Sequence, residues 1–397
     1  MNTASVSDSW RDPAAFGVLA GALTELLLGW WSDDGRRDPA QKPWMFTADG
    51  LWPKPDDALD PYGIWIAEVM LQQTQLPVAL PYWRRWMQAF PSLEALAAAQ
   101  EHDVLLLWQG LGYYARGRRL LTAARLLRDQ ISPASSQQAD AWPRTLEAWL
   151  AVPGIGPSTA GGILSSAFNS PAAILDGNVR RVLARVMAHP QPPAAAQRLF
   201  WSWSEALLAA APQRSRDLNQ ALMDLGATLC TPRNPACGRC PWQPHCAAHA
   251  VGVPEGFPVK APPRSVPHLS LGVGLTRNAA GEVLIVQRPS SGLLGGLWEF
   301  PSGEQRPEEP IVSTIGRHLS SHFGMDVEVE APLLAFQHAY SHRKLHCQVH
   351  FCRWRHGEPD AQARWVAPAD LARYPLSAAH ARIAAALQQH LAERESP

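Results

Sequence analysis

The sequence predicts two folded domains of different class, an all-α domain over residues 14–250 and a smaller α+β domain over residues 268–397. Three observations support this division. The first part carries apolar residues at three- and four-residue spacing, the helical period, and almost no strand pattern. The second part changes to short β-branched and alternating runs that are typical of strands. Between them, residues 251–267 hold five prolines, which predicts a linker.

Length and composition agree with a multidomain globular protein. The 397 residues exceed what one core usually organises, and 46% hydrophobic with 18% charged residues is typical of folded chains. The N-terminus lacks the pattern of a secretion signal, and no apolar run is long enough to span a bilayer. We therefore expect a cytoplasmic protein with no membrane partner.

Charge does not by itself identify a partner. The formal net charge is zero, but residues 110–185 hold nine arginines and four acidic residues. This local excess fits a face that binds a phosphate backbone, and it fits ordinary solvated helix surfaces equally well.

The predicted helices of the first domain follow from apolar periodicity. They cover residues 14–31, 62–75, 82–90, 93–99, 103–110, 115–130, 145–150, 158–167, 178–187, 197–211 and 215–225. Between residues 33 and 61 lies a stretch rich in Pro, Asp and Gly. It is too long for an ordinary loop, so we interpret it as either a functional segment or an insertion.

In the second domain, alternating and β-branched runs predict strands, and longer periodic runs predict helices. The strands cover residues 268–276, 283–287, 345–354 and 364–366, and the helices cover residues 311–323 and 378–391.

Residues 150–162 predict a helix-hairpin-helix. Two helical patterns flank a turn with Gly154 and Gly156. Glycine allows close approach of the backbone to a ligand, and the second helix offers free N–H groups at its start, near Ser158, so this turn is suited to bind phosphate. Many helix pairs are joined by such a turn that has no function. The interpretation as a phosphate-binding hairpin therefore depends on the other motifs of the sequence.

The segment Ile174-Leu-Asp-Gly-Asn-Val-Arg-Arg-Val182 places Asp176 at the start of a helix. An aspartate there is often only a helix cap. Its position on the helix that follows the hairpin, with two arginines in the next turn, favours a functional role.

Four cysteines within 17 residues indicate a metal site. Cys230, Cys237, Cys240 and Cys246 form the pattern C-x6-C-x2-C-x5-C, and four thiolates suit either tetrahedral zinc or a 4Fe–4S cluster. Zinc sites usually pair two Cys-x-x-Cys units and only one occurs here, so the spacing favours the cluster. The two other cysteines, Cys347 and Cys352, lie five residues apart in a predicted strand and should face opposite sides as packing residues.

Together these motifs resemble the helix-hairpin-helix, iron–sulfur DNA glycosylases, and within them the adenine glycosylases of the MutY type. The resemblance spans residues 16–391. Further matching motifs are Ala67-Glu-Val-Met-Leu-Gln-Gln-Thr-Gln75, Gly110-Leu-Gly-Tyr-Tyr-Ala-Arg116 and Met223-Asp-Leu-Gly-Ala227.

The resemblance implies a base-excision repair enzyme that removes adenine mispaired with 8-oxoguanine or guanine in double-stranded DNA. It implies that Glu68 is the general acid that protonates the adenine, that Asp176 stabilises the oxocarbenium sugar, and that Asn178 is a polar partner beside it. It also implies that Leu71, Gln73 and Tyr113 enter the duplex around the lesion pair. The four cysteines would bind a 4Fe–4S cluster that shapes a DNA-binding loop. We expect a monomer associated with a bacterial nucleoid.

The local sequence around the two carboxyl groups agrees with these roles. Glu68 lies in an apolar helix, where desolvation should raise its pKa so that it holds a proton near neutral pH. Asp176 lies at a helix start near Arg180 and Arg181, an environment that we expect to keep it ionised, as the stabilising carboxylate of a glycosidase requires.

Ser158 distinguishes two kinds of glycosylase. Related enzymes that also cut the DNA strand carry a lysine at this hairpin position, which forms a Schiff base. Serine cannot do so, and Arg180 stands where a lysine often follows the Asp-Gly-Asn-Val motif. We therefore expect a glycosylase without strand-cleaving activity.

The second domain resembles a Nudix domain through Gly295-Gly-Leu-Trp-Glu-Phe-Pro-Ser-Gly303. Nudix hydrolases hold Mg²⁺ with glutamates on the following helix, but His318, Ser321 and His322 stand at those positions. Hydrolysis should therefore be lost. The resemblance implies that the domain instead recognises 8-oxoguanine through Tyr340, Ser341 and His342, where the family has Phe-Ser-His.

One departure and two alternatives remain. Pro43-Trp44 matches a family motif but is followed by extra residues up to Asp60.

Two alternative functions were considered. An oxidised-pyrimidine glycosylase and AP lyase of the endonuclease III type is disfavoured by Ser158 and by the second domain. A DNA-binding redox sensor without enzymatic activity would leave Glu68 and Asp176 without a function.

Overall fold

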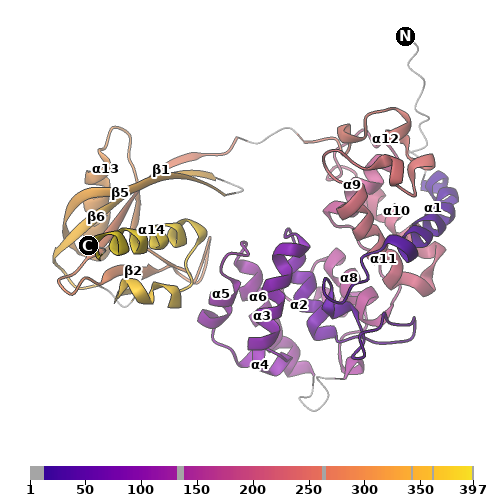
Figure 1. The fold of residues 1–397 in the computed structure, drawn as a ribbon, viewed down its shortest axis with the longest axis horizontal. Coiled ribbons are helices and arrows are strands. Elements are labelled where there is room, and N and C mark those ends of the chain that lie inside the picture. The colour runs from indigo at the N-terminus through magenta and orange to yellow at the C-terminus, as the bar shows by residue number, and fades with distance from the viewer. Residues whose placement is uncertain (1–12, 132–137, 262–264, 341–342, 360–361, 396–397) are drawn as a thin grey trace, which may run out of the picture. The chain divides into compact units, whose positions relative to one another are not determined.

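The computed structural model describes residues 13–131, 138–261, 265–340, 343–359 and 362–395 (Figure 1). Its internal packing divides the chain into two compact units. One comprises residues 1–98 with 119–262, and the other comprises residues 99–118 with 263–397. This division differs from the predicted domains in one respect, because residues 99–118 pack with the C-terminal unit. Among the described helices, none combines the length and the apolar character needed to cross a membrane.

The first unit consists of helices, as the periodicity predicts. Its α-helices are α1 (Pro13–Asp34), α2 (Pro61–Leu71), α3 (Leu76–Ala89), α4 (Leu93–Ala98), α6 (Ala115–Gln130), α7 (Leu146–Leu150), α8 (Pro157–Phe168), α9 (Gly177–Val186), α10 (Gln197–Ala210), α11 (Ser215–Asp224) and α12 (Ala247–Ala250). Helix α5 (Glu101–Trp108) and the first residues of α6 belong to the C-terminal unit. A π-helical turn, η5 (Leu225–Leu229), continues α11.

One predicted helix is wrong at its end. The helix predicted over residues 62–75 ends at Leu71, and Gln73 adopts a left-handed backbone with φ 57°. A new helix starts at Leu76 rather than at Tyr82. Pro77 lies in the first turn of that helix, where a missing N–H breaks no hydrogen bond, so proline begins the helix rather than preventing it.

A hydrophobic core joins α1 to α9, α10 and α11. Phe16, Trp31, Phe200 and Trp203 are almost fully buried in it. Because α9 carries Asp176 at its N-terminus and leads toward the cysteine loop at its other end, this core fixes the helix that connects the two predicted sites.

The segment between α1 and α2 is an ordered part of the first unit. The Arg216 guanidinium, almost fully buried, donates to the backbone carbonyls of Lys54 (2.9 Å) and Asp57 (2.6 Å). Trp52 Nε1 donates to Asp217 (3.0 Å). A short 3-10 turn, η2 (Pro43–Met45), is buried through Trp44 and Met45. Hydrogen bonds therefore hold the extra residues after Pro43-Trp44 against α11.

The C-terminal unit is built on a seven-stranded sheet in the order β3-β2-β1-β6-β5, with β4 added to β1 and β7 added to β2. The strands are β1 (His268–Arg277), β2 (Val283–Gln287), β3 (Trp298–Glu299), β4 (Ser302–Glu304), β5 (Asp326–Tyr340), β6 (Arg343–His356) and β7 (Ala363–Val366). Strands β1 and β6 pair in parallel, and the other pairs are antiparallel.

Two helices cover opposite faces of this sheet. Helix α14 (Ala378–Glu395) packs in one core with Cys347, whereas α13 (Ile311–Phe323) packs in a second core with Cys352 (Figure 1). This confirms that the two cysteines face opposite sides as packing residues. Strand β5 was not predicted. Its sequence is interrupted by Pro332 and by acidic residues, and the ladder to β6 contains register shifts around Pro332, which is typical of an edge strand.

Candidate active site

Helix α2 presents Glu68 from an apolar environment. Asp60 caps the helix by accepting from the N–H groups of Tyr62 (3.0 Å) and Gly63 (2.9 Å). The residues from Pro61 to Ala67 are buried, whereas Glu68 is half-buried. Its carboxyl group lies against α8 at Gly162, where a Cβ atom would come within 2.6 Å of Glu68 Oε2. A larger residue at this position would require the carboxyl group to shift.

The environment of Glu68 favours its neutral form. Burial, and then the negative charge of Asp176, raise the pKa of Glu68 to about 7, while the charge of Lys42 acts in the opposite direction. Among the described residues, no donor forms a hydrogen bond to the carboxyl group that would offset the burial. The prediction of a raised pKa for Glu68 is therefore confirmed.

Asp176 caps α9, as the sequence suggests. Its Oδ1 accepts from the N–H of Val179 (2.8 Å), and Asn178 Nδ2 lies 3.4 Å from its Oδ2. The preceding residue is held by the hairpin, because Ser158 Oγ accepts from the N–H of Leu175 (3.0 Å). The serine that stands at the lysine position of strand-cleaving relatives thus anchors the loop that carries Asp176.

The environment predicted for Asp176 is wrong in one respect, because burial raises the pKa of this carboxyl group as it does for Glu68. Arg181 and Arg180 do lower the pKa of this carboxyl group, as do the backbone hydrogen bonds, but burial outweighs them and the pKa of Asp176 is raised. The sequence shows the neighbouring arginines but not the depth at which the carboxyl group lies. The two carboxyl groups therefore share a desolvated environment instead of having opposite ones.

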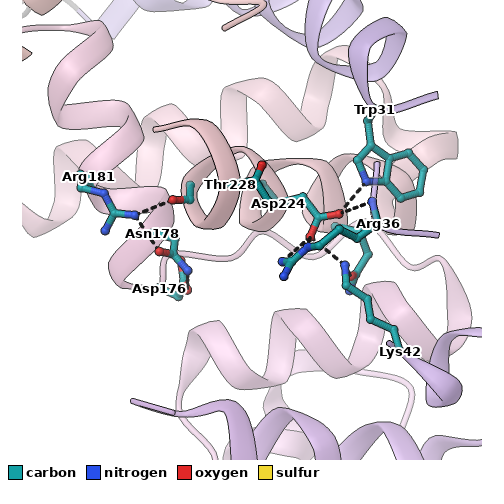
Figure 2. Close-up of polar contacts among 10 residues, drawn as sticks. Trp31, Arg36, Lys42, Asp176, Asn178, Arg181, Asp224 and Thr228 are labelled. Carbon is teal, nitrogen blue, oxygen red and sulfur yellow. Dashed lines mark hydrogen bonds and ion pairs between the residues drawn. The ribbon is translucent and has the colours of Figure 1, made fainter. Parts of the chain in front are cut away.

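Helix α9 links Asp176 to the cysteine loop. Arg181 donates to Asn178 Oδ1 (2.8 Å), beside Asp176 (Figure 2). It also donates to the carbonyl groups of Gly226 (2.7 Å) and Cys230 (2.8 Å). Arg185, one turn further, is buried and donates to Cys230 Sγ at 3.3 Å. Polar contacts therefore run continuously from the carboxyl group to the first cysteine.

The four cysteines of the loop line one small cavity of about 20 Å³. Within the described ranges, no three His, Cys, Asp or Glu side chains converge closely enough to hold a single metal ion. Four soft thiol ligands around a shared cavity, with Arg185 donating to one sulfur, fit a multi-iron cluster.

The hairpin has the predicted geometry. Helix α7 leads to Gly154, whose φ of 88° is in the left-handed region, and Gly156 immediately precedes Pro157, the first residue of α8. A Cβ atom at Gly154 would also lie only 3.0 Å from Arg119 Cβ. Glycine is thus required there for two reasons.

Of the residues predicted to enter the duplex, two have strained backbones. Gln73 follows α2 and is exposed, and Tyr113, which is 53% exposed, has φ 47°. Non-glycine residues in this region often mark functional positions. Leu71 is the last residue of α2 and is half-buried. Tyr113 belongs to the C-terminal unit, whereas Leu71 and Gln73 belong to the first.

Sequence analysis missed a buried ion cluster around Asp224 (Figure 2). Asp224, 1% exposed at its side chain, accepts from Trp31 Nε1 (3.1 Å), from the N–H and guanidinium of Arg36 and from Lys42 Nζ (2.8 Å). Lys42 also donates to Gln220 Oε1 (2.9 Å). An aspartate inside the apolar motif Met223–Ala227 was the available signal, since a buried carboxylate requires partners.

In the C-terminal unit, Tyr340 ends β5, where it pairs with Arg343 of β6. Ser341 and His342 lie outside the described residues. Helix α13 carries His318, Ser321 and His322, and no acidic residue occurs within its 13 residues. Burial, and then the nearby His322, lower the pKa of His318 to about 4. The helix thus lacks the carboxylates that a Mg²⁺ site of the Nudix type needs.

Comparison with known proteins matches three family models to the chain. They are the "HhH-GPD superfamily base excision DNA repair protein" over residues 66–206, the "Iron-sulfur binding domain of endonuclease III" over residues 230–246 and the "NUDIX domain" over residues 272–386. The second family binds a 4Fe–4S cluster, so the chain has this cofactor site at its four cysteines.

Several similar proteins are adenine DNA glycosylases. The adenine DNA glycosylase of Rattus norvegicus is 34% identical over 93% of this chain and 78% of its own length. That of Homo sapiens is 33% identical over 86% of this chain and 68% of its own length. That of Buchnera aphidicola subsp. Baizongia pistaciae is 33% identical over 57% of this chain and 58% of its own length.

Proposed function

The chain belongs to the adenine DNA glycosylases, and we propose that Glu68 and Asp176 are the two carboxyl groups with which it hydrolyses the bond between adenine and deoxyribose. The observation that supports this proposal is the raised pKa of Glu68, about 7, beside a second carboxyl group. Such a pair, in which one group keeps a proton and the other is ionised, is what glycosidic hydrolysis requires.

Glu68 acts as the general acid. Adenine is a poor leaving group as an anion, so it must receive a proton as the C–N bond breaks. A carboxyl group with a pKa near the working pH is protonated in a substantial part of the molecules and still gives up its proton readily. Its carboxyl group lies against Gly162 of α8, and delivery of the proton from this position requires a base held in a defined orientation.

Asp176 stabilises the positive charge that develops on the sugar, with Asn178 as its polar partner. The N–H of Val179 and the amide of Asn178 donate to its two oxygens. These donors favour the ionised form, so within the pair the negative charge lies on Asp176 and the proton lies on Glu68.

The substrate is double-stranded DNA with adenine opposite 8-oxoguanine or guanine, and the adenine leaves the base stack before reaction. Leu71, Gln73 and Tyr113 enter the duplex around the pair, and the hairpin at Gly154, Gly156 and Ser158 binds phosphate. In the C-terminal unit, Tyr340, Ser341 and His342 contact the oxidised base. The protein acts as a monomer at the nucleoid of a bacterial cell.

Cys230, Cys237, Cys240 and Cys246 hold the 4Fe–4S cluster. When bound, the cluster supplies structural order to the loop over residues 230–246 and no step of the hydrolysis.

Base release under single-turnover conditions tests this proposal. Duplexes with adenine opposite 8-oxoguanine, guanine or cytosine, and a duplex with thymine glycol, are each incubated with excess protein, and free base is measured. Adenine release opposite 8-oxoguanine should be fastest, without strand cleavage. Glu68→Gln and Asp176→Asn should each lower the rate at least about 100-fold, the usual range for general acid–base groups. Full activity of Glu68→Gln would refute the assignment.

A further inference from the structure

Lys42 is the one buried lysine among the described residues. Its side chain is 5% exposed, and its ammonium group donates to Asp224 Oδ1 at 2.8 Å and to Gln220 Oε1 at 2.9 Å. A charge is costly to bury unless partners compensate it. Its presence at the edge of the active site therefore requires a reason.

Charge compensation of Asp224 does not supply that reason. Arg36 already binds Asp224 through its guanidinium at 2.6 and 2.8 Å and through its backbone N–H, and Trp31 adds a fourth donor. The buried carboxylate is thus neutralised without Lys42. The ammonium group adds a second positive charge to a site that holds one negative charge.

The contacts of Gln220 lead from Lys42 toward Glu68. Gln220 Oε1 accepts from Lys42, and its Nε2 donates to Ser166 Oγ on α8 at 3.3 Å. Gly162 lies one helical turn before Ser166, on the same face of α8, and the Glu68 carboxyl group lies directly against Gly162. Glu68 therefore contacts α8 directly, and Lys42 is connected to the next turn of the same helix through Gln220.

Both groups have unused hydrogen-bonding capacity. An ammonium group has three donors, and two of those of Lys42 have partners in the described part of the chain. Burial lowers the pKa of Lys42, and the charge of Glu68 is among the weaker effects that oppose this shift. In turn, the charge of Lys42 lowers the pKa of Glu68. The other charged groups that act are Asp176 on Glu68, and Asp224 and Arg36 on Lys42.

We propose that Lys42 is a positioning residue of the active site, held by Asp224 and Gln220 so that its charge limits how tightly Glu68 keeps its proton. This inference rests on the proposed role of Glu68 as the general acid. Without Lys42, the effects of burial and of the negative charge of Asp176 would be unopposed, and Glu68 would hold its proton more strongly. An acid that holds its proton too tightly transfers it slowly. With Lys42 in place, Glu68 exchanges its proton near neutral pH.

The pH dependence of adenine excision tests the role of Lys42. The single-turnover rate is measured across neutral pH for the wild type, Lys42→Met, Lys42→Gln and Lys42→Arg. The matched control is Lys54→Met, which removes one exposed positive charge from the same segment. Loss of the buried charge should move the alkaline decline of the rate upward by about one pH unit in Lys42→Met and Lys42→Gln. Lys42→Arg and Lys54→Met should keep the wild-type profile.

The outcomes separate this inference from the proposed function. An unshifted profile in a folded Lys42→Met or Lys42→Gln protein would overturn the role of Lys42. If both neutral variants lose the folded state in thermal melting, the residue is structural and the proposal is equally overturned. If Glu68→Gln retains full activity, it is the proposed general acid that fails. A dead Glu68→Gln enzyme together with an unshifted Lys42→Met profile would refute the present inference alone.

Discussion

Replacing Gly162 with alanine tests whether the position of the Glu68 carboxyl group sets the rate of the reaction. Gly162 lies within α8, and a Cβ atom there would be 2.6 Å from Glu68 Oε2 and 2.9 Å from the carboxyl carbon. Ordinary contacts begin near 3.4 Å, so the carboxyl group must move by about 0.8 Å. The obstacle is the end of a flexible side chain, which can move.

The change should separate activity from stability. Alanine in place of a helical glycine favours the helix by about 0.8–1 kcal/mol, which offsets the cost of displacing Glu68. The free energy of unfolding should therefore change by less than about 1 kcal/mol. A misplacement of about 1 Å at the reacting centre can cost on the order of 100-fold in rate, so excision should fall by one to two orders of magnitude.

Two other glycines provide controls for Gly162→Ala. At Gly161, a Cβ atom would lie 2.1 Å from the backbone carbonyl of Ala173, which cannot move aside, so Gly161→Ala should destabilise by about 1–3 kcal/mol. At Gly316, on α13, nothing lies within 4 Å, so Gly316→Ala should stabilise modestly and leave excision unchanged. Urea unfolding and single-turnover excision are measured for all three. Wild-type excision by Gly162→Ala would show that the observed carboxyl position does not matter.

Three further outcomes are expected. Because the pKa of Glu68 is raised from 4.5 to about 7 in the folded state, this group contributes stability below pH 4.5 that is lost as the pH rises to 7. Above pH 7, the free energy of unfolding of Glu68→Gln should therefore exceed that of the wild type by up to about 3 kcal/mol, measured by urea unfolding. Equal stability at pH 8 would contradict the raised pKa. Arg185→Met should make the cluster easier to oxidise, seen as faster loss of its visible absorbance in air, because Cys230 Sγ loses its donor; an unchanged decay would refute this. Ser158→Ala should slow excision without strand cleavage, since Leu175 N–H loses its acceptor, and a Ser158→Thr enzyme with the same defect would show that the hydroxyl group is not what matters.

Local patterns predicted most elements because each pattern is decided by nearby residues. The helical period identifies α9 and α13 almost to the residue, and the alternation of β1 and β6 reflects a sheet with one helix on each face. Strand β5 was missed because Pro332 and several carboxylates interrupt its pattern, and the partner that stabilises it lies in β6. Long-range pairing overrode the local signal there.

Features of the site that depend on neighbours in the sequence could be predicted. Features that depend on which distant residues are buried together were missed. The apolar residues around Glu68 in sequence are also its neighbours in space, so its raised pKa could be predicted. Lys42, Gln220 and Asp224 come from segments about 180 residues apart, and no local pattern joins them. The segment after Pro43-Trp44 could be identified as unusual, but its attachment to Arg216 depends on the fold.

The raised pKa of Asp176 changes how the two carboxyl groups divide their tasks. Burial raises the pKa of both groups, and the negative charge of Asp176 raises the pKa of Glu68 further. In the proposed mechanism the pair shares one proton, and hydrogen bonds decide its place. Asp176 has donors from Val179 and Asn178, whereas Glu68 has Gly162 beside it and no described donor, so the proton lies on Glu68. Removing the Asn178 amide should therefore move proton density toward Asp176 and slow excision while leaving Glu68 in place. Asn178→Asp should intensify this effect, because it adds a third carboxyl group beside the pair.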